Sequence, residues 1–104
     1  MSTGGVRALR VEANGQGGVA VKGAITFDNA GEALRAAPQA TRGGDLGVDL
    51  SGLVDADSVS LAVLIAWVAQ TKAGGAGLRY LNAPQGLRNL ARLSDVEGLL
   101  GFKD

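Results

Sequence analysis

The sequence predicts a small α/β domain, a mixed β-sheet with helices packed mainly on one face, in the order ββαβαβα. Short apolar stretches with period-two alternation indicate strands. Between them lie segments whose apolar residues recur every three or four positions and which are bounded by Asp, Pro or Gly, as is typical of helices. A length of 104 residues suits one modest hydrophobic core, so we expect a single domain over residues 1–104.

The first two elements form a predicted hairpin. Residues 7–12 and 19–23 are strand-like, and residues 14–18 between them are Asn-Gly-Gln-Gly-Gly. Asn and Gly tolerate the positive φ angles of tight turns. This glycine-rich turn joins two strands and opens no helix, which argues against a phosphate-binding loop.

A helix and the central strand follow. Asp28 can cap a helix over residues 28–37, and Pro38 ends it. Residues 46–50 then alternate apolar and small or polar side chains, which predicts a strand with one buried face.

The second half of the chain repeats the alternation of helix and strand. Residues 58–72 form the longest predicted helix, which Gly74 and Gly75 end. A strand is predicted over residues 78–82, a helix from Pro84 onward, and a short last helix over residues 95–101.

The longest helix carries two apolar stripes on nearly opposite sides. At about 100° per residue, one stripe comprises Leu61, Leu64, Ile65 and Val68. The other comprises Val59, Val63, Ala66 and Trp67. The second stripe lies either under a neighbouring element or against another protein. We expect Val63 and Trp67 to face a partner, with Trp67 as the anchor, because binding energy concentrates on such residues.

An acidic turn leads from the central strand into this helix. Asp55 and Asp57 precede Ser58, which stands on the first helical turn, where backbone N–H groups are unpaired and the helix dipole is positive. Asp57 is expected to cap the helix, and Ser58 is either a simple capping residue or a regulatory contact for a partner.

Composition excludes several classes of function. The chain has no His and no Cys, so the usual general bases, nucleophiles and metal ligands are missing, and we expect no enzyme activity, cofactor or metal. Ten basic residues balance ten acidic ones, which gives no argument for nucleic acid. The most apolar run, residues 61–69, is far shorter than the roughly 20 residues that cross a bilayer, so any membrane contact is expected through a partner.

The strand, acidic turn and helix of VDLSGLVDADSVSLAVLIAWVAQ resemble the signature of STAS domains, small modules named after sulphate transporters and anti-sigma-factor antagonists. The typical core, Asp-Ser/Thr-small-Gly-Leu, corresponds here to residues 57–61, Asp-Ser-Val-Ser-Leu. The stretch from Leu81 to Leu93 also resembles the family's later strand and helix. The resemblance covers residues 6–100 and implies the STAS fold.

Two functions are implied by the resemblance. In anti-sigma-factor antagonists a kinase phosphorylates a hydroxyl two residues after the Asp; here Val59 stands there, and Ser60 replaces the usual Gly. The MlaB subfamily has the hydroxyl directly after the Asp, as Ser58 follows Asp57. Membership of that subfamily implies a cytoplasmic accessory subunit, peripheral to the inner membrane, that binds the MlaF-like ATPase of a phospholipid-transporting ABC complex and helps to maintain outer-membrane lipid asymmetry.

The resulting expectation is a partner-binding or regulatory site at one end of the long helix. Its residues are Asp57, Ser58, Val59, Ser60, Val63 and Trp67. A signalling module that binds an anti-sigma kinase is the alternative, and direct binding of a small ligand in a groove near Ser58 is a weaker third one.

Overall fold

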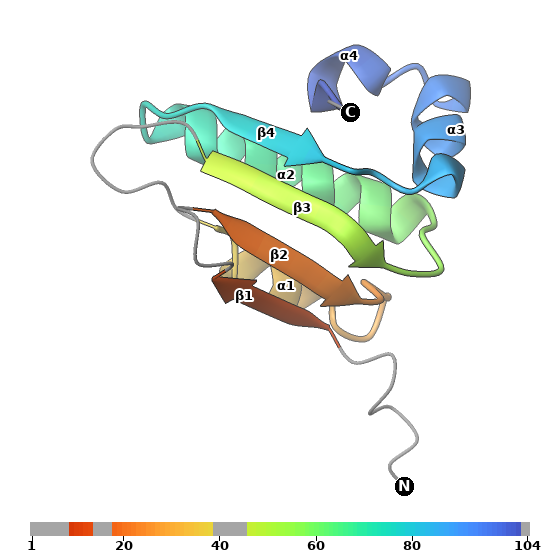
Figure 1. The fold of residues 1–104 in the computed structure, drawn as a ribbon, viewed down its shortest axis with the longest axis horizontal. Helices are drawn as coiled ribbons and strands as arrows, with labels where there is room; N and C mark the ends of the chain where they lie inside the picture. The colour runs from red at the N-terminus through yellow and green to blue at the C-terminus, as the bar shows by residue number, and fades with distance from the viewer. Residues whose placement is uncertain (1–8, 14–17, 39–45, 103–104) are drawn as a thin grey trace, which may run out of the picture.

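The structure is a computed structural model that describes residues 9–13, 18–38 and 46–102, and its centre is a four-stranded mixed sheet (Figure 1). In the order β1-β2-β3-β4, the strands are β1 Arg10–Ala13, β2 Val19–Gly23, β3 Leu46–Leu53 and β4 Leu78–Leu81. The helices are α1 Ala30–Arg35, α2 Ser58–Ala73, α3 Gln85–Leu93 and α4 Glu97–Leu100. Helices α1 and α2 lie on one face of the sheet, and α3 and α4 lie beyond the β4 edge (Figure 1).

Strand pairing confirms the predicted topology. β1 and β2 are antiparallel, as a hairpin requires, whereas β2 with β3 and β3 with β4 are parallel. The turn predicted at residues 14–18 lies mostly outside the described residues, as does the start of the strand predicted at residues 7–12. Because β2, β3 and β4 are parallel, α1 and α2 are crossover helices that start at the same edge of the sheet.

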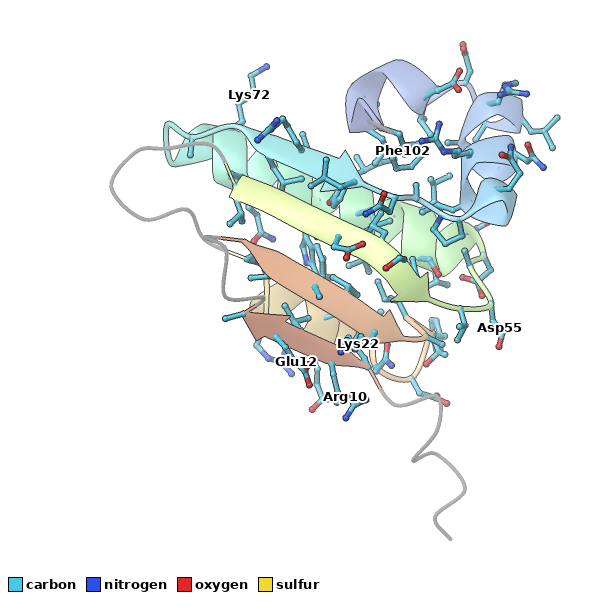
Figure 2. The ribbon with its side chains drawn as sticks, viewed as in Figure 1. Arg10, Glu12, Lys22, Asp55, Lys72 and Phe102 are labelled. Atoms are coloured by element: carbon cyan, nitrogen blue, oxygen red, sulfur yellow. The ribbon has the colours of Figure 1, made fainter. Side chains whose placement is uncertain are left out.

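The core forms between the sheet and α2. In β3, Leu46, Val48 and Leu50 are buried. Ser51, which alternates with them, is exposed, so the period-two pattern predicted the buried face correctly. The strand runs to Leu53, three residues beyond its predicted end. The opposite face is charged near β1, where Glu12 lies 3.5 Å from Lys22 (Figure 2).

Helix α1 is shorter than predicted, and its capping residue differs. It covers Ala30–Arg35, and the residue before it is Asn29, so the prediction that Asp28 caps the helix is wrong. The Asn29 side chain instead accepts from the Thr26 backbone N–H at 2.8 Å and donates to the Ala24 carbonyl at 2.9 Å. These bonds fix the β2–α1 loop in place of a helix cap.

Helix α1 packs against the second apolar stripe of α2 and covers Trp67. Trp67 has no exposed surface, and its indole N–H donates to the Ala33 carbonyl of α1 at 2.9 Å. Val63 is only 3% exposed. The expectation that Trp67 faces a partner is therefore wrong. The physical reason is that the β2–β3 crossover places α1 directly beside that side of α2.

The C-terminal helices close the β4 edge of the core. The buried Tyr80 hydroxyl of β4 donates to the Leu64 carbonyl of α2 at 2.6 Å, and burial raises the pKa of Tyr80 above its ordinary value. Phe102, labelled in Figure 2, lies with its ring 6.1 Å from the Tyr80 ring. The Arg88 guanidinium of α3 lies over the Phe102 ring. In the described part of the chain, no helix is long and apolar enough to span a bilayer.

Candidate functional site

The acidic turn after β3 leads into α2, and a capping box holds the first turn of that helix. Asp57 is the N-cap of α2, and its carboxylate accepts from the backbone N–H groups of Val59 and Ser60, each at 3.0 Å. The Ser60 hydroxyl in turn accepts from the Asp57 N–H at 3.2 Å, which completes a capping box. The predicted capping role of Asp57 is confirmed, and the cap fixes where the next residue, Ser58, is presented.

Ser60 joins this helix start to the β2–α1 loop. Its hydroxyl is fully buried and donates to the Ile25 carbonyl at 3.1 Å. The backbone N–H of Val54 donates to the Gly23 carbonyl at 2.9 Å, which holds the β3–α2 loop against the same segment. The two loops that precede α1 and α2 therefore lie side by side (Figure 1).

An open apolar groove runs from this point between α1 and α2. Its volume is about 390 Å³. We call it the α1–α2 groove, and its lining residues are Ala30, Leu34, Ser58, Val59, Ala62, Val63 and Ala66. Ser58 supplies the single hydroxyl of this lining. The groove is open to solvent along its length, since Ser58 and Ala62 are exposed.

The structure brings three of the six predicted site residues into the lining of the groove. Ser58 and Val59 line one end of the α1–α2 groove, and the buried Val63 lines it further along α2. Asp57 and Ser60 form the capping box at the start of α2 and do not line the groove. Trp67 is not part of the groove, because α1 covers it.

The sequence reasoning missed the α1 side of the groove. Ala30 and Leu34 of α1 and Ala62 of α2 line it, although none was chosen as a site residue. Phe27, in the loop just before α1, is 86% exposed. The sequence did contain one indication of the groove. Val59, Ala62 and Ala66 recur at helical spacing, and their short side chains leave room for another element to pack against α2.

Among the described residues, no group of three or more His, Cys, Asp or Glu side chains could hold a metal ion. Asp49 lies on the sheet, where the Ser51 backbone N–H, donating at 2.9 Å, holds the pKa of that carboxyl below its ordinary value. Asp49 therefore makes a local hydrogen bond within β3.

The fold and the groove define a small α/β binding module with an exposed hydroxyl at a helix start. A protein-family model described as "Mlab, STAS domain" matches residues 9–101. The chain therefore belongs to this family of STAS domains, and the predicted STAS fold, MlaB-like, is confirmed. STAS domains are generally non-catalytic binding modules. No curated protein matches the sequence.

Substitutions of Ser58 test whether a partner docks at this end of the α1–α2 groove. Ser58→Arg places a bulky cation at the helix N-terminus and over the entrance, so we expect it to block docking of a partner while the domain stays folded. Ser58→Ala removes only an exposed hydroxyl and should change the free energy of unfolding by less than about 0.5 kcal/mol. Copurification of each variant with the partner, beside a urea denaturation curve, measures both effects; normal copurification of Ser58→Arg would remove Ser58 from the site.

Proposed function

We propose that this protein is a non-catalytic accessory subunit of an Mla-type phospholipid-transporting ABC complex. In this role it binds the MlaF-like ATPase subunit through the start of α2 and the α1–α2 groove, and it regulates that ATPase on the cytoplasmic side of the inner membrane. The complex would maintain outer-membrane lipid asymmetry, and the domain would reach the membrane only through it. The MlaB-like family match supports this choice among the roles of STAS domains.

The observation that carries the proposal is the chemistry of the first turn of α2. Val59, at the place where signalling relatives carry their phosphorylated hydroxyl, lines the apolar groove and cannot accept phosphate. Ser60 is fully buried and bonded to the Ile25 carbonyl, so a kinase cannot reach it without opening the helix start. This arrangement favours constitutive docking over a phosphorylation switch.

The alternative is a signalling module that binds an anti-sigma kinase. One observation favours it: the Ser58 hydroxyl is exposed beside the groove, where a kinase could reach it. A phosphate there would benefit from the helix dipole. It would also lie next to the Asp57 carboxylate, which opposes its roughly two negative charges.

Intact-mass measurement separates the two functions. We expect protein purified from growing and from stressed cells to have the mass of the unmodified chain in both cases. Val59 has no hydroxyl, Ser60 is buried, and a phosphate on Ser58 would lie next to the Asp57 carboxylate. The ATPase subunit should copurify with it under both conditions. A stoichiometric phosphate on Ser58 or Ser60 that changes with stress would overturn the transporter role and support the signalling alternative.

A further inference from the structure

The apolar surface at the start of α1 and α2 extends beyond the groove. Phe27 is 86% exposed and Val54 is 42% exposed. Phe27 sits in a turn closed by the Asn29 N–H, which donates to the Thr26 carbonyl at 3.2 Å, while the Asn29 side chain bonds Thr26 and Ala24. An apolar ring this exposed contributes no burial energy to the free domain, so its surface is available to a partner that docks beside the groove.

Charge is distributed unevenly over this surface. Residues 24–34 and 54–71, which build the groove and both preceding loops, contain four acidic residues and neither Lys nor Arg, although the whole chain is neutral. Asp28, Asp55 and Asp57 lie in the loops or at the cap where the two helices begin. The cations Arg35 and Lys72 stand in the last turns of α1 and α2, and Figure 2 shows Asp55 and Lys72 at opposite ends of α2.

The shape of the surface favours one form of occupant. The groove is walled by two helices, whose backbone groups are bonded within each helix, so a β-strand could not add to it by main-chain hydrogen bonds. From Ser58 to Ala66 it runs about 12 Å along α2, at 1.5 Å per residue. That length matches about two turns of a helix. The small side chains of Ala30, Ala62 and Ala66 allow a third helix to approach closely.

We propose that the occupant of the α1–α2 groove is an amphipathic α-helix of the partner protein, with Lys or Arg at the end that meets Asp28, Asp55 and Asp57. Its apolar face fills the groove and its end covers Phe27. Its basic residues lie over the acidic loops, which speeds association and sets the direction of the helix. This inference rests on the proposed function for the existence of a partner, but it specifies the chemistry of the partner segment.

Photo-crosslinking identifies that segment. The probe is p-benzoylphenylalanine at Phe27, which replaces one aromatic ring by another, in the full chain in its native host. The same probe at Leu93, which is 85% exposed on α3, is the matched control. Mass spectrometry of the product at position 27 should identify a segment whose synthetic peptide binds the purified domain, becomes helical on binding and carries Lys or Arg at one end.

Charge variants test whether the basic end of that peptide lies over the acidic loops. Asp28→Asn with Asp55→Asn should weaken peptide binding at least about threefold and reduce its salt dependence. Asn keeps the left-handed backbone of Asp55, whose φ is 52°. Asp95→Asn is the control because Asp95 has a similar φ of 59° and lies in the turn between α3 and α4; it should leave binding unchanged.

The outcomes separate this inference from the proposed function. A basic helix from a protein other than an ATPase would support the inference and overturn the transporter role. An ATPase crosslinked through an acidic, extended or loop segment would support the transporter role and overturn the inference. A lipid, a second copy of this chain, or no product specific to position 27 would also overturn the inference, as would equal binding by the charge variants and the Asp95→Asn control.

Discussion

Replacing Trp67 with alanine should destabilise the domain by about 3–5 kcal/mol, which is the typical cost of removing a large buried aromatic side chain. Trp67 has no exposed surface, and its loss would leave a cavity between α2 and α1. It would also leave the Ala33 carbonyl without its indole donor. Since domains of this size are stable by only about 5–15 kcal/mol, the urea midpoint should fall steeply.

Two controls separate this effect from a general sensitivity to substitution. Phe27→Ala removes an aromatic ring that is 86% exposed and should change the free energy of unfolding by less than about 0.5 kcal/mol. Trp67→Phe keeps most of the ring volume but not the N–H, so its cost should lie between the other two. Far-UV circular dichroism follows unfolding in all of them. A Trp67→Ala domain as stable as the wild type would show that Trp67 is not core and would revive it as an interface residue.

The sequence predicted best what depends on local chemistry. The alternation in residues 46–50 identified the buried face of β3, because a strand places successive side chains on opposite faces. Asp57 was identified as the cap of α2 because its carboxylate needs only the N–H groups two and three residues ahead. Neither conclusion required knowledge of the neighbouring elements.

The roles that the sequence analysis misassigned depend on which secondary-structure elements lie next to each other in the fold. A helical projection shows that α2 has two apolar sides, but it cannot show that the six-residue α1 covers Trp67. The residue that precedes α1, Asn29 rather than Asp28, is likewise fixed by contacts outside the helix. The Asn29 side chain bridges Thr26 and Ala24, a bond pattern that needs an amide donor and that a carboxylate cannot supply.

The groove was not predictable as a surface because its two walls are distant in sequence. Ala30 and Leu34 face Val59 and Ala62 only because the β2–α1–β3–α2 crossover sets the two helices side by side. The sequence did indicate one end of it, since Ser58 and Val59 were chosen from the position of the helix start. The sequence therefore predicted the end of the candidate site at the start of α2, but it did not predict the residues of α1 that line the other side.

Ala62→Lys should weaken binding of the proposed ATPase partner by about 100-fold while leaving the free domain intact. Ala62 lies in the middle of the groove and is exposed in the free domain, so a Lys there can extend into solvent and should cost less than about 0.5 kcal/mol of stability. In a complex, the same ammonium would be buried without a counter-charge. An uncompensated buried charge costs about 3 kcal/mol or more, which corresponds to about 100-fold weaker binding.

Ala69→Lys is the matched control for this variant. Ala69 is exposed on the same helix, seven residues further on, and does not line the groove, so the substitution has the same helix propensity and the same charge. Binding of each variant to the purified ATPase subunit is measured by biolayer interferometry, with urea unfolding to establish equal stability. Wild-type affinity of Ala62→Lys would show that partners dock elsewhere. Equal losses in both variants would mean that binding responds to added charge anywhere along α2 and that the groove has no special role in it.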